Sequence, residues 1–217
     1  MAEESLAVLA KISSNVYYIG DVAKMNAGCP YQVIPASIND DVGLCAMAVY
    51  EKGRNRVLAI KGTSLRGTDI GQDISMVLGG TGSYTLVQPT LDLGRRLISQ
   101  YNVNLITGHS LGGYIAEILA TTVRIAGASF CGPGVNGPVI KLGGKETSGF
   151  QNIQYEHDAL GNFNCAVYQH VQWSVYCDMS GHSIDGMVEY FKARPGVTNR
   201  NVVSRSSSHM TGYYYPN

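Results

Sequence analysis

Apolar residues follow two spacings along this chain, and each spacing predicts a different kind of element. Segments of strand length that are rich in apolar or β-prone residues occur at 44–50, 56–60, 103–106, 125–131, 152–157 and 171–177. Elsewhere apolar residues recur three or four positions apart, as on one face of a helix, which predicts helices over 5–12, 91–101, 114–120 and 184–191. Strands that alternate with helices predict an α/β fold in which a mostly parallel central sheet carries helices on both faces.

Polar and glycine-rich segments separate these runs. The polar segment 51–55 lies between two apolar runs and predicts a hairpin, so the first strands are expected to pair antiparallel. The segment 78–84 is rich in glycine and is predicted to be a mobile connection. Because 217 residues suffice for one sizeable core and the chain is mostly polar from position 196, we expect a single domain over 1–195 and a polar tail over 196–217.

The most informative motif is the segment 108–112, Gly-His-Ser-Leu-Gly, which joins a predicted strand to a predicted helix. Glycines on either side of Ser110 keep Cβ atoms out of a turn that has little room for them. The serine hydroxyl then lies at the N-terminal end of the helix, where backbone N–H groups and the helix dipole favour negative charge. This setting suits a nucleophile whose attack generates an oxyanion. The structural alternative is a tight turn in which Ser110 only caps the helix.

Composition and charge restrict the partners and cofactors. Charged residues make up 15% of the chain, and its 16 basic side chains balance 16 acidic ones without forming a basic cluster. A nucleic-acid partner is therefore not expected. No apolar segment reaches the length of a membrane span, so no integral membrane segment is expected either. The five cysteines show no paired metal-binding spacing, and we expect neither a metal nor another cofactor.

The cysteines and the first residues also bear on where the protein is located. An odd number of cysteines leaves at least one thiol unpaired, which fits a reducing compartment better than a secreted, disulfide-bonded domain. The segment 1–5 is acidic where a signal peptide would be basic. These features favour a cytoplasmic or otherwise intracellular protein, with Cys45 and Cys131 as buried thiols within strands.

Two further turns accompany the segment 108–112, and each follows a predicted strand. The turn Lys-Gly-Thr-Ser at 61–64 follows the strand at 56–60, and Gly-Pro-Gly at 132–134 follows the strand at 125–131. Together with Gly-His-Ser-Leu-Gly-Gly at 108–113, these turns resemble the class 3 lipase family of α/β-hydrolases, although Lys61 stands where that family usually has arginine. The resemblance covers about residues 5–191 and implies an α/β-hydrolase fold and a serine hydrolase acting on carboxylic esters, lipids among them.

A serine hydrolase needs a base that accepts the hydroxyl proton and a carboxylate that orients the base. In α/β-hydrolases the acid follows the serine in the chain and the histidine follows the acid. Asp158 comes directly after the predicted strand 152–157, so we expect it at the same edge of the sheet as Ser110. The resemblance points to the same aspartate. Asp178, which follows the predicted strand 171–177, is the alternative acid.

Among the histidines, His182 is the best candidate for the base. It lies beside a glycine in a loop before the last predicted helix, where the family also carries its histidine. His209, in the polar tail, is the alternative, whereas His170 is expected to be a structural residue at the start of a strand. His109 belongs to the turn itself and is expected to point away from the substrate. His157 would face the side of its strand opposite to the predicted acid.

The resemblance also implies an oxyanion hole and a class of substrate. The backbone N–H groups of Leu111 and Thr63 would form the oxyanion hole, and the Thr63 hydroxyl would hold its loop or donate as well. The segment 64–74 has few large apolar residues, which favours an esterase or a phospholipase-like enzyme over a lipase with an apolar lid. The glycine-rich segment 77–84 is predicted to act as a gate. The expected partner is an ester or lipid substrate, with transient contact with a lipid surface.

Two other functions remain open from the sequence. An acyltransferase would use the same serine, acid and base, with an alcohol in place of water. A catalytically silent member of the fold would serve as a binding or structural module. Because a silent module has no need of a nucleophile, base, acid and oxyanion donors in the correct order, the sequence favours the ester hydrolase.

Overall fold

A computed structural model describes residues 2–40, 44–62, 83–133, 135–136, 149–158, 168–169 and 174–201. At its centre lies a sheet that has seven strands within these residues, in the order β1-β2-β3-β4-β5-β7-β9. The strands are β1 (Gln32–Val33), β2 (Met47–Lys52), β3 (Asn55–Ile60), β4 (Leu105–His109), β5 (Ala126–Phe130), β7 (Phe150–His157) and β9 (Ser174–Ser180). A separate short ladder pairs β6 (Val135–Asn136) with β8 (Tyr168–Gln169).

Most of the central sheet is parallel, as the sequence predicts. The strands β3, β4, β5, β7 and β9 run parallel to one another. At the other edge, β1 and β3 each pair antiparallel with β2. Lys52 lies opposite Asn55, which leaves a two-residue turn and confirms the predicted hairpin. The chain therefore has an α/β fold with a mostly parallel sheet.

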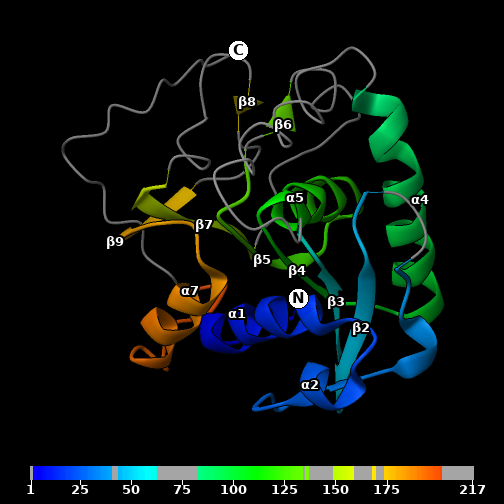
Figure 1. The fold of residues 1–217 in the computed structure, drawn as a ribbon, viewed down its shortest axis with the longest axis horizontal. Helices are drawn as coiled ribbons and strands as arrows, with labels where there is room; N and C mark the ends of the chain where they lie inside the picture. Colours follow the sequence, from blue (N-terminus) through cyan, green and yellow to red (C-terminus); the bar gives the residue numbers. More distant parts are fainter. Residues whose placement is uncertain are drawn as a thin grey trace.

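Helices cover both faces of this sheet (Figure 1). They are α1 (Leu6–Asn15), α2 (Val22–Asn26), α4 (Ser83–Tyr101), α5 (Leu111–Val123) and α7 (Ile184–Lys192), with short 3-10 helices η1 (Val16–Tyr18) and η2 (Pro35–Ser37). Successive side chains of a strand face opposite sides, and β3 shows this clearly. Leu58 and Ile60 join the apolar cluster of α4 and α5, whereas Val57 and Ala59 join the cluster of α1 and α7. The two layers of core hold the ends of the strands at fixed positions.

Two elements differ in extent from the predictions. Helix α4 begins at Ser83, passes through Pro89 and so includes the last residues of the predicted connection; residues 63–82 lie outside the described residues. Strand β9 ends at Ser180 rather than at position 177. Its length follows from its pairing with β7, which continues past Cys177 through an irregularity to Ser180. We expected Asp178 to follow this strand, but it lies inside the strand.

The first and last described segments of the chain pair with each other. Ser5 and Thr198 form an isolated antiparallel bridge. Asn199 is fully buried: its Oδ1 accepts a hydrogen bond of 2.8 Å from the Glu4 backbone N–H, and its Nδ2 donates one of 2.6 Å to the Gly149 carbonyl. These contacts continue past position 195, where we expect the domain to end. Residues 202–217 of the predicted tail lie outside the described residues.

No helix within the described segments combines the length and the apolar character that crossing a bilayer requires. Cys45 and Cys131 are 3% and 0% exposed, which confirms that they are buried. Both were expected within strands, but Cys45 lies just before β2 and Cys131 just after β5.

Helix α7 carries the end of the chain back onto the sheet, and its docking depends on Phe191. This side chain is 2% exposed and packs edge-to-face against Phe130 of β5, with ring centroids 6.2 Å apart. We expect Phe191→Ala to lower the free energy of unfolding in urea by about 3–5 kcal/mol, because it removes a large buried side chain. The control Lys192→Ala, at an exposed neighbour, should change it by less than about 0.5 kcal/mol. A cost below about 1 kcal/mol for Phe191→Ala would contradict this packing.

Candidate active site

Ser110 lies in the turn between β4 and α5 and has an unusual backbone conformation. Its φ and ψ are 56° and −127°, a backbone region that residues other than glycine rarely occupy. Two backbone hydrogen bonds hold the turn: the Ser110 N–H donates to the Phe130 carbonyl (2.9 Å), and the Ser110 carbonyl accepts from Tyr114 (3.1 Å). The side chain is 2% exposed, and its Oγ has no hydrogen-bond partner among the described residues.

This conformation persists because the backbone of α5 packs directly onto the ends of two strands. A Cβ atom on Gly108 would collide with the carbonyl of Gly112, and one on Gly112 would collide with the carbonyl of Ile60. Glycine at both positions is therefore required for this approach. The predicted strand, tight turn and helix are confirmed. Leu111 is the first residue of α5, so its backbone N–H belongs to the unpaired donors at the helix N-terminus.

The structure brings Asp158 and His182 together. Asp158 follows β7 and is fully buried, while His182 lies between β9 and α7 with 20% of its side chain exposed. The Nδ1 atom of His182 lies 2.8 Å from Oδ2 and 3.0 Å from Oδ1 of Asp158. Because a carboxylate only accepts hydrogen bonds, Nδ1 carries the proton and Nε2 has a free lone pair in the neutral ring. That Nε2 atom is buried and has no partner among the described residues.

Ser110, Asp158 and His182 all follow the carboxyl ends of strands in the parallel part of the sheet. Ser110 follows β4, Asp158 follows β7 and His182 comes two residues after β9. The strands β4, β5, β7 and β9 are adjacent in that order, so these ends share one edge of the sheet (Figure 1). Ligands of such sheets bind outside this edge.

The loop that carries His182 and the start of α7 after it are fixed by hydrogen bonds from three different elements. The His182 carbonyl lies 2.9 Å from Nε2 of His109 in β4. Tyr155 of β7 donates to the Ser183 carbonyl at 2.7 Å, and Ser14 of α1 donates to the Asp185 carboxylate at 2.7 Å. The imidazole is therefore oriented by the loop backbone as well as by the carboxylate on Nδ1.

His109 is engaged through both ring nitrogens. Its Nδ1 lies 2.8 Å from the hydroxyl of Tyr17 in η1, and its Nε2 lies against the His182 carbonyl. The residue is 6% exposed; this burial, together with the neighbouring His182, lowers the pKa of His109 to about 3. His109 is therefore neutral at physiological pH. Our expectation that it merely points away from the substrate overlooked these contacts, and nothing in the local sequence singles out Tyr17.

One cluster among the described residues has side chains close enough to be considered for a metal ion. The ligand atoms of His109, Cys131 and His182 all lie within 4.8 Å of one another. Both nitrogens of His109 are already hydrogen-bonded. Burial, together with the charge of Asp158 and a hydrogen bond to it, raises the pKa of the Cys131 thiol well above its usual value. A protonated thiol and an occupied imidazole are poor metal ligands, so this arrangement favours hydrogen bonding within the site.

Several predicted residues cannot be compared with the structure. Thr63, His170, His209 and the segments proposed as lid and gate lie outside the described residues, apart from the start of α4. His157 is exposed, which agrees with its exclusion as a base. The roles of the remaining candidates stay predictions.

No protein-family model matches the chain, and no curated protein matches it either. The likeness to class 3 lipases therefore depends on the motifs at 61–64, 108–113 and 132–134. A function for this chain is inferred from its motifs and from the geometry of the site.

The low pKa of His109 predicts a pH-dependent contribution to stability. The unfolded chain binds a proton at this histidine below about pH 6.5, whereas the folded protein binds it only near pH 3. The contribution is therefore complete above pH 6.5 and is lost as the pH falls toward 3. Between pH 6 and pH 4, unfolding in urea should show wild type losing up to about 1.4 kcal/mol per pH unit more than His109→Gln. Parallel curves for the two proteins would contradict a buried neutral His109.

Proposed function

We propose that this protein is a serine carboxylester hydrolase with an α/β-hydrolase fold, similar to class 3 lipases, in which Ser110, His182 and Asp158 form a catalytic triad. One observation carries the proposal. The buried Asp158 is paired with His182 at 2.8 Å, and both lie at the same edge of the sheet as a serine in a strained strand-to-helix turn. An acid, a base and a serine nucleophile in this chain order are what acyl transfer requires.

In the proposed reaction, Oγ of Ser110 attacks the carbonyl carbon of the ester while Nε2 of His182 accepts the hydroxyl proton. Asp158 stabilises the imidazolium that results. When the tetrahedral intermediate collapses, the carbon–oxygen bond to the alcohol breaks, and His182 returns the proton to the departing alkoxide. Water, deprotonated by His182, then attacks the acyl-enzyme and releases the carboxylic acid and Ser110.

The environment of these groups supports this chemistry. The oxyanion would accept hydrogen bonds from the backbone N–H of Leu111 and, by resemblance, of Thr63. The N-terminal end of α5 favours the same negative charge. Ser110 and Asp158 are 2% and 0% exposed, so their interactions with the developing charges are screened little by water.

The proposed substrates are esters that bind to a site without an apolar lid over it. The sequence of the segment 64–74 carries few large apolar residues, which favours small esters or phospholipids over emulsified triacylglycerols. Rates on p-nitrophenyl esters of increasing acyl length, with and without micelles, would define the class.

The nucleophile is tested with a fluorophosphonate probe, which labels activated serines covalently. We expect wild type to be labelled and Ser110→Ala not to be labelled, because the probe bonds to Oγ. The matched control is Ser99→Ala, at an exposed position of helix α4, which should be labelled as fast as wild type. Failure to label intact wild type, or labelling that survives Ser110→Ala, would refute the proposal.

The acid and the base are tested by the kinetics of p-nitrophenyl butyrate hydrolysis. Asp158→Asn should lower kcat by about 10³–10⁴-fold with KM little changed, because the amide orients the imidazole in the wrong tautomer. His182→Ala should cause a similar or larger loss. His209→Ala, the control for the alternative base, should retain the wild-type rate. If only His209→Ala abolished hydrolysis, His182 would not be the base.

A further inference from the structure

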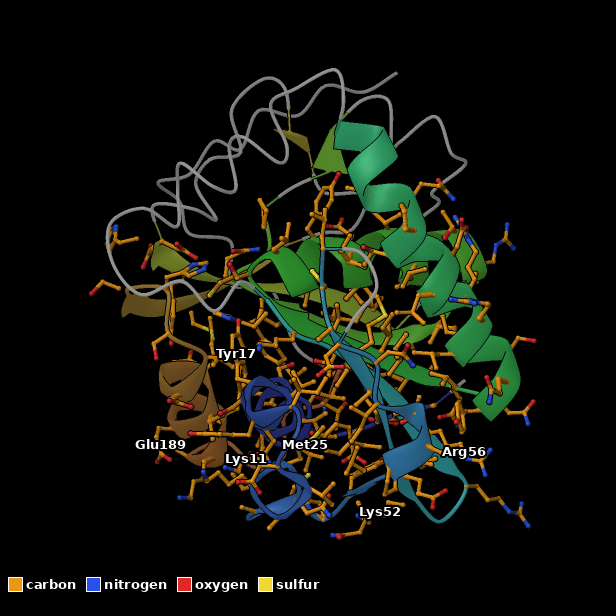
Figure 2. The ribbon with its side chains drawn as sticks, turned by 45° about the vertical axis from the view of Figure 1, so that its right-hand side comes forward. Lys11, Tyr17, Met25, Lys52, Arg56 and Glu189 are labelled. Carbon is orange, nitrogen blue, oxygen red and sulfur yellow. The ribbon has the colours of Figure 1, made fainter. Side chains whose placement is uncertain are left out.

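Tyr17 contacts two parts of the candidate site although it belongs to neither the turn nor the loop of His182. It lies in η1, directly after α1, and on the side of α1 that faces the sheet (Figure 2). Its hydroxyl is 2.8 Å from Nδ1 of His109 and also packs against the backbone of Gly62. A Cβ on Gly62 would collide with this hydroxyl and with the carbonyl of His109, which shows how closely the three residues pack.

The direction of every hydrogen bond in this chain of groups follows from one fixed acceptor. The carbonyl of His182 can only accept, so Nε2 of His109 must donate to it. His109 is neutral, so its Nδ1 carries no proton and accepts from the Tyr17 hydroxyl. The two hydrogen bonds therefore have compatible directions, from the Tyr17 hydroxyl to His109 and from His109 to the His182 carbonyl. Gly62 packs against the Tyr17 hydroxyl at the start of this relay.

We infer that Tyr17 and His109 are positioning residues that join the turn before Thr63, the nucleophile turn and the loop of the base into one rigid unit. This inference rests on the proposed function, because it assigns a role relative to the proposed triad. Neither residue touches the reacting atoms in this role. Tyr17 holds His109 in the Nε2–H tautomer, and His109 holds the backbone at His182.

A hydrogen bond to the carbonyl of His182 can set the orientation of the loop backbone. Gly181, the residue before His182, has a φ of 120°, and glycine has little intrinsic preference for any one backbone conformation. A donor on the next carbonyl fixes the peptide plane and with it the direction of the imidazole, whose centroid is 4.9 Å from that of His109. A misplacement of 1 Å at a reacting group can cost 100-fold in rate.

The first test removes the Tyr17 hydroxyl. In Tyr17→Phe, Nδ1 of His109 loses its donor, so only the contact with the His182 carbonyl still orients the ring, and the ring is free to tilt. We expect kcat for p-nitrophenyl butyrate to fall about ten-fold with KM unchanged, because the loss affects alignment and not substrate binding. The control is Tyr18→Phe, at the next residue, which is 50% exposed and should leave kcat unchanged. Equal kcat in Tyr17→Phe and wild type would overturn the inference.

The second test separates the two contacts of His109. A glutamine amide reaches about as far as Nε2, so His109→Gln retains a donor for the His182 carbonyl. An asparagine amide reaches only as far as Nδ1, so His109→Asn retains the contact with Tyr17 and loses the contact with His182. We expect kcat to fall about ten-fold or more in His109→Asn and less than three-fold in His109→Gln. Equal losses in the two variants would mean that His109 only fills space.

Two further measurements separate failure of this inference from failure of the proposed function. Nitrogen-15 NMR of the imidazoles should show His109 as the Nε2–H tautomer in wild type, with an Nδ1 resonance that shifts in Tyr17→Phe because its hydrogen bond is lost, whatever the protein catalyses. If this tautomer is absent from wild type, the relay is wrong. If the tautomer is present but wild-type Ser110 is not labelled by fluorophosphonate, the proposed function is wrong and the positioning role fails with it.

Discussion

The contact between the backbone of α5 and the ends of β3 and β4 is the constraint on which the rest of the site depends. Gly108 and Gly112 allow helix and strands to approach without an intervening side chain. The close approach forces Ser110 to a φ of 56°, a conformation that costs on the order of 1–3 kcal/mol. Helix α5 offsets this cost because it is buried along nearly its whole length. The serine therefore has one position, to which the proposed acid, base and oxyanion donors must be matched.

The proposed acid, Asp158, and the proposed base, His182, are held by a second set of interactions that reach across the sheet. A buried carboxylate is costly unless it is paired, and Asp158 meets this requirement through His182. Segments from three parts of the chain then fix the loop of His182. Ser14 of α1 and Tyr155 of β7 act directly, and Tyr17 of η1 acts through His109. The N-terminal segment thus belongs to the site, although it contributes none of the proposed reacting groups.

Local patterns predicted most of the fold, and interactions between distant segments explain where they did not. The hairpin, the parallel strands and the strand–turn–helix around Ser110 follow from the spacing of apolar residues and from glycine, which act within a few positions. The end of β9 at Ser180 depends on its partner β7, and the burial of Asn199 depends on pairing with Glu4. Neither partner is recognisable from the residues around β9 or Asn199. The Tyr17–His109 contact joins residues 92 positions apart, so no local signal marks Tyr17.

The sequence by itself determined the alternation of strands and helices, the turn that contains Ser110 and a short set of candidate acids and bases. Only the tertiary structure decided which candidates meet. Parallel pairing of β7 with β9 brings the residues after both strands to one edge, so Asp158 reaches His182, while Asp178 is held inside β9. The same packing places His109 between Tyr17 and the loop of His182, with a hydrogen bond to each. The physical reason is that residue spacing controls local conformation, whereas contacts across the sheet depend on strand register and on which helices share a face.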